Sequence, residues 1–397
     1  MDEASVVPAV TDKQALDPAP RAAQGRYAQK SDESDRKRRQ TLGQFLTPPP
    51  VADLMAGFFH GPWRRVNLLD PGAGEGSLTC AFVRRMCQTQ KKPQAISVTA
   101  YELDTLMLGP LERALSGCKK DCERVGIKFR YKIHHSNFIS TVAPSIKPDL
   151  FTTEPERFNF AIVNPPYRKI RSDSLERIHL RLAGVETTNL YAGFLSIITR
   201  LLTKGGQLVA ITPRSFCNGP YFKPFRVAFL DQMAIRRLHV FESRVAAFRT
   251  QNVLQENVII HAVKGNQKPH SVVVSQSSGE PGDKGNGRRV ELDDVILPDD
   301  RDKFIHFPVG RTQKHAKAAV QRLSATLANL GIQVSTGRVV DFRAARFLRQ
   351  DPTEDTVPLI YPNHFCRFTV EWPKAKSRKP NATRCPTLSF MIQNATG

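Results

Sequence analysis

The chain of 397 residues lacks the features that would tie it to a membrane or to an oxidising environment. No apolar run reaches the roughly 18 to 20 residues that span a bilayer, and acids interrupt the N-terminus, so a secretory signal is not indicated. The seven cysteines are scattered and contain no CxxC pair, which disfavours a disulfide scaffold and a zinc site. These absences favour a reduced, cytoplasmic protein without a bound metal.

Acidic residues are scarce relative to basic ones. The chain has 37 Asp and Glu against 58 Lys and Arg, and its formal net charge is +21. A protein with so large a basic excess generally has an anionic partner, most often nucleic acid. Scattered solvated charge is the alternative, but it carries less weight because an aromatic-bearing site accompanies the charge.

Composition and periodicity divide the chain into three parts. Residues 1–38 lack periodicity and are expected to form a disordered basic extension. Residues 39–265 alternate strand and helix patterns, which predicts a doubly wound, mostly parallel α/β domain. Residues 266–397 are expected to form a linker and a second module, and the Gly- and Ser-rich stretch 264–289 is expected to be a loop or boundary.

Seven strands are expected in the α/β domain, and the last two of them form an antiparallel hairpin at the sheet edge. The apolar runs that predict them lie at residues 66–70, 96–101, 129–134, 158–163, 207–212, 235–240 and 257–263. Helices are expected between them at 75–87, 104–117, 190–203 and 222–232.

Four residues, Asn164-Pro165-Pro166-Tyr167, follow the strand expected at 158–163. The two prolines fix the backbone and remove two N–H donors, so the side-chain oxygen of Asn164 and the carbonyl oxygen of Pro165 can accept from one small donor. An amino group held in this way loses planarity, and its lone pair becomes available for attack. Since Tyr167 offers a ring for stacking, the motif suits methylation of an exocyclic amine on a base taken out of a duplex.

A glycine-rich turn at 70–76 (DPGAGEG) follows the first expected strand and opens a helix. Glycine permits tight turns and close approach to a ligand. Glu102 ends the next strand, where an acid of a doubly wound fold binds ribose hydroxyls. The glycine spacing is GxGxG rather than GxGxxG, and no phosphate-binding Lys follows. A nucleoside without a pyrophosphate, S-adenosylmethionine, therefore fits better than NAD or ATP.

Two further polar residues each have two interpretations. Asn137 follows the third expected strand, where it can accept from the adenine amino group of the cofactor or simply satisfy a turn. Thr47 precedes Pro48 at a good helix start, so the residues alone favour a capping role for it.

In their order along the chain, these segments resemble the gamma-class adenine-specific (N6) DNA methyltransferases of restriction–modification systems. The resemblance spans roughly residues 37 to 380, and motif X stands ahead of motif I, as in that class. Motifs X, I, II, III and IV correspond to GQFLTP (43–48), DPGAGEG (70–76), YELD (101–104), SNF (136–138) and NPPY (164–167), and the stretches 202–214 and 240–260 complete the set.

The resemblance implies a Rossmann-like class I S-adenosylmethionine-dependent methyltransferase fold. The catalytic domain would have a seven-stranded mixed sheet at 39–265, and a partial target-recognition domain would lie within 266–397. Thr47, Asp70, Gly72 and Gly74 would hold the methionine part of S-adenosylmethionine, and Glu102 would bind its ribose.

Two positions qualify the resemblance. Asn137 stands where the family usually has Asp, so weaker cofactor binding is expected, although an amide oxygen can still accept a hydrogen bond. Phe248 resembles the second aromatic residue that sandwiches a flipped base against Tyr167, and a core Phe before a strand is its alternative interpretation.

The resemblance implies transfer of a methyl group from S-adenosylmethionine to adenine N6 in double-stranded DNA, with base flipping and no metal. Three alternatives stay open: N4-cytosine methylation, methylation of a glutamine side chain as in release-factor methyltransferases, and a catalytically impaired DNA-binding remnant. The resemblance stops after Ala382, which predicts a C-terminally truncated recognition domain. No nuclease signature is present, so a cognate restriction endonuclease would be a separate protein, while the oligomeric state is not predicted.

Overall fold

The computed structural model describes residues 46–384, except for 62, 147–153, 243–255, 266, 280–282, 284, 309–318, 321, 326, 328 and 334–343. The chain divides between Lys317 and Ala318 into two compact units. The division lies beyond the boundary expected at 265/266, because the strands that follow residue 265 still belong to the sheet of the first unit.

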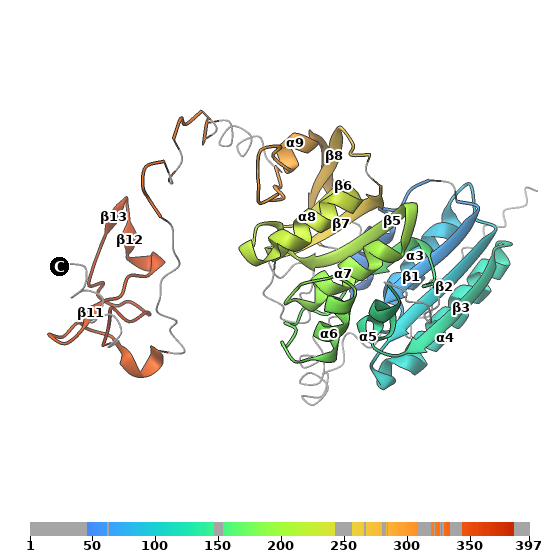
Figure 1. Ribbon diagram of the computed structural model, residues 1–397, viewed down its shortest axis with the longest axis horizontal. Coiled ribbons are helices and arrows are strands. Elements are labelled where there is room, and N and C mark those ends of the chain that lie inside the picture. Colours follow the sequence, from blue (N-terminus) through green and yellow to red (C-terminus); the bar gives the residue numbers. More distant parts are fainter. Residues whose placement is uncertain are drawn as a thin grey trace, which may run out of the picture. The chain divides into compact units, whose positions relative to one another are not determined.

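A nine-stranded sheet in the order β3-β2-β1-β4-β5-β7-β6-β8-β9 forms the centre of the first unit (Figure 1). Strands β3, β2, β1, β4 and β5 run parallel, and β7 is antiparallel to both β5 and β6. The strands are β1 Arg65–Pro71, β2 Ala95–Glu102, β3 Lys128–His135, β4 Phe158–Val163, β5 Leu202–Pro213, β6 Met233–Phe241, β7 Asn257–Lys264, β8 Ser271–Ser277 and β9 Asn286–Glu291.

Helices cover both faces of this sheet (Figure 1). The α-helices are α2 Pro49–Ala56, α3 Ser77–Gln88, α4 Thr105–Arg124, α5 Phe138–Val142, α6 Leu175–Leu182, α7 Leu190–Leu201, α8 Lys223–Gln232 and α9 Leu292–Val295. Short 3-10 helices are η1 Ala143–Ile146, η2 Arg214–Cys217, η3 Pro220–Phe222, η5 Ala345–Phe347 and η6 Pro362–His364.

Strand β4 shows how the sheet separates two cores. Phe160 and Ile162 pack in the core formed with α2, α3 and α4, whereas Ala161 and Val163 pack in the core formed with α5, α6, α7 and α8. Burial on both faces explains why this segment is a continuous apolar run rather than an alternating one. The mostly parallel, doubly wound α/β architecture expected from the sequence is confirmed.

Strands β8 and β9 extend the sheet beyond the seven strands that the sequence predicted. Because β8 pairs in parallel with β6, the antiparallel pair β6–β7 is not at the sheet edge. The prediction of a loop over 264–289 is therefore wrong for β8. The serines of β8 favoured the prediction of a loop. In the structure, Ser275 and Ser277 are buried, and their hydroxyl oxygens each lie 2.9 Å from a ring nitrogen of the buried His239.

Hydrogen bonds around Asn381 organise the described part of the second unit. Its side-chain oxygen lies 2.8 Å from His364 Nε2, its side-chain nitrogen donates to the Gln350 carbonyl at 2.9 Å, and its own carbonyl accepts from Trp372 Nε1 at 2.6 Å. The strands are β10 Leu348–Arg349, β11 Val357–Pro358 and β14 Ala382–Thr383 in one sheet, and β12 Phe365–Cys366 with β13 Thr369–Val370 in another.

Within the described residues, no helix has the length and apolar character needed to cross a bilayer. The same residues contain no group of three or more His, Cys, Asp or Glu side chains placed to hold a metal ion.

Candidate functional site

A cavity lies at the carboxyl ends of β1, β2, β3 and β4. In open α/β sheets, ligands bind at this edge where the strand order reverses, here between β1 and β4. Its volume is about 730 Å³, including the space at its open mouth. It is lined by Leu46, Gly72, Gly74, Tyr101, Glu102, Leu103, Ser136, Asn137, Phe138, Asn164, Pro166, Arg168, Leu190 and Phe194.

The glycine loop after β1 is tied to the end of β2. The Gly72 N–H donates to the Tyr101 carbonyl at 2.7 Å, and the Gly74 N–H donates to Glu102 Oε2 at 2.7 Å. Gly72 and Gly74 have φ values of 77° and 56°, a region that residues with side chains rarely adopt. The loop can therefore bring its backbone to the cavity wall.

Glu102 holds the loop through one oxygen and the start of α4 through the other. Its Oε1 accepts from the Asp104 N–H at 2.7 Å, and burial raises the pKa of the carboxyl group. Carboxylate oxygens can each accept more than one hydrogen bond, so these contacts are compatible with the predicted binding of ribose hydroxyls.

Asp70 is not among the residues that line the cavity. It is fully buried at the end of β1, where its Oδ2 accepts from Thr79 Oγ1 of α3 at 2.6 Å. Burial raises the pKa of Asp70 to about 7. The contact joins β1 to the helix that follows the glycine loop, so Asp70 supports the loop from behind.

Asn164 lines the cavity, and Thr47 orients its amide. Asn164 Nδ2 donates to Thr47 Oγ1 at 3.0 Å, although 117 residues separate them, so the amide oxygen faces away from Thr47. Pro165 is buried, and Pro166 lines the cavity beside Asn164. The structure thus brings together the two segments that resemble motif X and motif IV.

Tyr167 lies next to the cavity rather than on its wall. Its hydroxyl donates to the Ile211 carbonyl at 3.3 Å, and its ring meets Tyr191 edge-on with 6.4 Å between centroids. Burial raises the pKa of Tyr167 well above its usual value, so the phenol is neutral. These packing partners were not predicted from the sequence. Phe248, which is expected to sandwich a flipped base against Tyr167, lies outside the described residues.

Asn137 caps α5 and also reaches across to α6. Its Oδ1 accepts from the Ser140 N–H at 3.1 Å, and its Nδ2 donates to Glu176 Oε1 at 3.2 Å. The same Glu176 oxygen accepts from Arg168 Nη2 at 2.9 Å. Arg168 directly follows the Asn-Pro-Pro-Tyr motif, so its position in the sequence could have identified it as a residue of the site. No sequence pattern pointed to Glu176.

The polarity of the cavity fits S-adenosylmethionine. The glycine loop and Glu102 suit a ribose, and Phe138 and Phe194 provide apolar surface for a flat base. Among the described residues that line the cavity, Arg168 carries the only basic side chain, so a cluster of cations for a pyrophosphate is not present there. The chain's own residues therefore match a nucleoside sulfonium better than a dinucleotide.

Solved structures share the fold at low sequence identity. A modification subunit ascribed to a type I restriction enzyme of Vibrio vulnificus YJ016 matches with a TM-score of 0.51 and 14% identity, over 73% of this chain and 64% of that one. The type IIG restriction endonuclease BpuSI matches with a TM-score of 0.50 and 14% identity, over 73% of this chain and 35% of that one. These likenesses show a shared α/β fold, and the cavity fits S-adenosylmethionine as the cofactor.

Sequence similarity is much closer. A family model described as Eco57I restriction-modification methylase matches residues 109–248. The type II methyltransferase M.PstI of Providencia stuartii is 39% identical over 362 residues, which cover 91% of this chain and 70% of the relative. The type II methyltransferase M.BsuBI of Bacillus subtilis is 38% identical over 353 residues, or 87% of this chain and 68% of the relative. The chain therefore belongs to the type II methyltransferases of restriction–modification systems.

Proposed function

We propose that this methyltransferase acts on adenine N6 in double-stranded DNA, and that the target base leaves the helix to reach the site. The observation that carries the proposal is the position of Asn164, Pro165 and Pro166. They end a buried parallel strand at the wall of the cofactor cavity, and Thr47 orients the Asn164 amide. An amine held there would lie beside the methyl donor.

In the proposed reaction, the protein contributes positioning and electrostatics. The Asn164 side-chain oxygen and the Pro165 carbonyl accept the two hydrogens of the exocyclic amine, which directs the nitrogen lone pair toward the cavity. When bound, S-adenosylmethionine supplies a methyl group activated by its sulfonium charge. Tyr167 stacks on the base, which returns about 1–3 kcal/mol of the cost of unstacking it, and Phe248 is the proposed second stacking residue. Orientation of this kind can provide a large part of a rate enhancement.

The cofactor roles inferred from the resemblance form part of the same proposal. Gly72 and Gly74 hold the methionine part. Asp70 supports their loop through Thr79 of α3, and Thr47 completes the methionine site through its contact with Asn164. Glu102 binds the ribose, and Asn137 contributes to the wall on the side of α5.

Double-stranded DNA as substrate is supported by the net charge of +21 and by the restriction–modification family. Binding that depends on phosphate contacts weakens steeply with salt, because counterions are released on association. A separate cognate restriction endonuclease and a cytoplasmic location follow from the same proposal. Residues after Ala318 are proposed as part of the target-recognition domain.

Nucleoside analysis of DNA methylated by the purified protein tests the base assignment. N6-methyladenine is the expected product. N4-methylcytosine would support the second candidate, since the same motif can hold the cytosine amine. Normal cofactor binding without any methylated nucleoside, at low salt and on genomic DNA with many sequences, would support the impaired remnant.

Asn164→Ala tests the catalytic assignment. Loss of one acceptor is expected to lower the rate of methyl transfer about 100-fold or more, by analogy with the removal of a single transition-state contact. Cofactor affinity, measured by calorimetry, should change far less because the glycine loop and Glu102 remain. Asn159→Ala is the matched control, because Asn159 lies at the other end of β4. Its side chain there accepts from the Asn67 N–H and donates to the Arg65 carbonyl. Transfer at the wild-type rate by the Asn164 variant would disprove the role.

A further inference from the structure

One carboxylate connects two walls of the cofactor cavity. Glu176 Oε1 accepts from Asn137 Nδ2 at 3.2 Å and from Arg168 Nη2 at 2.9 Å. Asn137 belongs to the wall after β3, and Arg168 to the wall after β4, directly behind the Asn-Pro-Pro-Tyr motif. Glu176 itself does not line the cavity, and its side chain is only 14% exposed.

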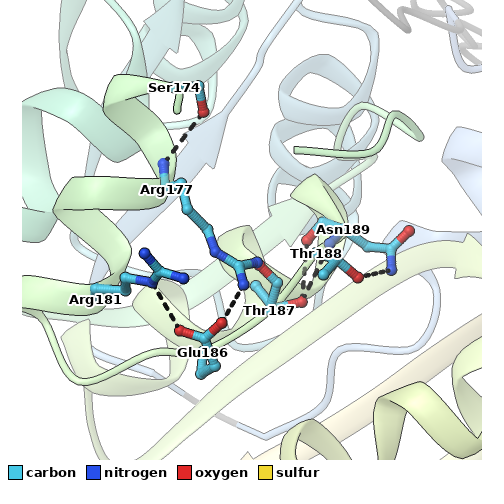
Figure 2. A network of polar contacts seen from close by, with 7 residues as sticks. All are labelled: Ser174, Arg177, Arg181, Glu186, Thr187, Thr188 and Asn189. Atoms are coloured by element: carbon cyan, nitrogen blue, oxygen red, sulfur yellow. Dashed lines mark hydrogen bonds and ion pairs between the residues drawn. The ribbon is translucent and has the colours of Figure 1, made fainter. Parts of the chain in front are cut away.

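Helix α6, which carries Glu176, is held firmly in place. The Ser174 side chain caps its N-terminus by accepting from the Arg177 N–H at 3.3 Å. The Arg177 guanidinium donates to the Thr187 carbonyl and to Glu186, which also accepts from Arg181 (Figure 2). These contacts join α6 to the segment that leads into α7, so the position of the Glu176 carboxylate is set from both ends of the helix.

The second face of α6 packs closely on α7. A Cβ atom added to Gly193 of α7 would lie 2.9 Å from Leu180 Cδ1, so a larger residue there would have to displace the Leu180 side chain. Leu180 is fully buried. These contacts fix α6 on two sides, so a change at Glu176 acts on both loops that contact it.

The contacts of Asn137 require an amide at this position. The Ser140 N–H can only donate, so the Asn137 oxygen must face it and the Asn137 nitrogen must face Glu176. Although burial disfavours its charge, backbone N–H groups and the Arg168 charge lower the pKa of Glu176, so it is ionised at neutral pH. An aspartate at 137 would place a second carboxylate against it.

We propose that Glu176 is a positioning residue for the cofactor cavity, which holds the loops after β3 and β4 in register through Asn137 and Arg168. Position 137 and position 176 form a matched amide–carboxylate pair in this protein. The proposal rests on the S-adenosylmethionine cofactor and does not depend on which base is methylated.

A double-mutant cycle tests the pair, with S-adenosylmethionine affinity measured by calorimetry in the absence of DNA. Although the resemblance alone led us to expect weaker binding with Asn137 than with Asp, Asn137→Asp should weaken binding about tenfold here, because the two adjacent carboxylates repel each other. Glu176→Gln should have a smaller effect, because its amide oxygen can accept from both donors. The double variant Asn137→Asp with Glu176→Gln should bind more tightly than Asn137→Asp alone, since the amide and the carboxylate have exchanged places.

Asp173→Asn is the matched control. Asp173 is an acid that lies just before α6, its side chain is 67% exposed, and it pairs with Arg171. Its replacement should leave the affinity unchanged. In methylation assays, the Asn137→Asp variant should show a raised cofactor KM with a smaller change in kcat.

Either of two results would overturn the proposal. One is wild-type affinity in Asn137→Asp, and the other is a double variant that binds no better than the single one. Melting temperatures of all variants separate loss of folding from loss of affinity. A purely structural role would lower the melting temperature and the cofactor affinity together in each variant, whereas a positioning role lowers the affinity at an unchanged melting temperature. Failure of adenine methylation with an intact cycle would count against the proposed function and leave this pair supported.

Discussion

Asp70 is a buried acid that the fold keeps close to its protonated form. Its pKa is raised to about 7 by burial, against about 4 for an exposed aspartate. An acid with a raised pKa in the folded state stabilises the fold at low pH, and that contribution is lost as pH rises from about 4 through 7. Its Oδ2 contact with Thr79 Oγ1 partly offsets the cost of the charge.

Asp70→Asn should therefore remove a pH-dependent cost. The melting temperature of the variant relative to wild type is expected to increase from pH 4.5 to pH 7.5 and to level off above that. The shift corresponds to about 4 kcal/mol at most. Thermal denaturation across this range at constant ionic strength measures it. If the melting temperatures of the two proteins differ by the same amount at every pH, the pKa of Asp70 is not raised in the folded protein.

Single residues of the site were predictable where local chemistry selects them. Gly72 and Gly74 need positive φ values, and Asn164 ends a strand before two prolines, so the sequence pointed to them without a structure. The contacts between distant residues were not predictable. Thr47 and Asn164 are 117 residues apart, and Asn137 meets Glu176 on a helix that no pattern had indicated.

Gly193 of α7 leaves room for the Leu180 side chain of α6. Gly193→Ala would force a Cβ to within 2.9 Å of Leu180 Cδ1, and overpacking of this kind typically costs about 1–3 kcal/mol. The variant should also weaken S-adenosylmethionine binding, because α6 carries Glu176. Chemical denaturation and calorimetry measure the two effects.

Gly117→Ala is the control for this helix pair. Gly117 lies in α4, and a Cβ there would meet nothing within 4 Å. Alanine is expected to stabilise this helix by up to about 1 kcal/mol without changing cofactor affinity. Equal changes in stability and cofactor affinity for Gly193→Ala and Gly117→Ala would mean that the α6–α7 contact does not restrict α6.

Strands that are buried on both faces, and helices with one continuous apolar side, were predicted well from the sequence. The apolar run at 158–163 coincides with β4, and α8 was expected almost at its observed bounds. Short or polar elements were missed. Helix α5 has five residues, too few for a periodic signal, and β8 contains serines whose hydroxyl groups contact His239 in the interior.

At the scale of the whole molecule, the first unit extends beyond the composition change near residue 265. A chain that ends at residue 265 would lose β8 and β9 and leave the backbone of β6 unpaired along one side. It would also expose His239, which is buried against β8. Such an open strand edge promotes association.

We expect the chain shortened to residue 265 to aggregate, and a chain that ends at residue 317 to stay monodisperse and bind S-adenosylmethionine. Size-exclusion chromatography with light scattering distinguishes them. If both shortened chains behave alike, β8 and β9 are dispensable for the fold of the first unit.

The described lining of the cofactor cavity has one more consequence. All of these residues fall between Leu46 and Phe194, so the wall that meets the methyl donor is made by the first half of the chain. The described residues after Phe194 include β5 to β9, which complete the sheet, and none of them is among the lining residues. Natural variation among the described residues after Phe194 can therefore alter the recognised DNA sequence or the stability of the fold without changing the described residues that line the cofactor cavity.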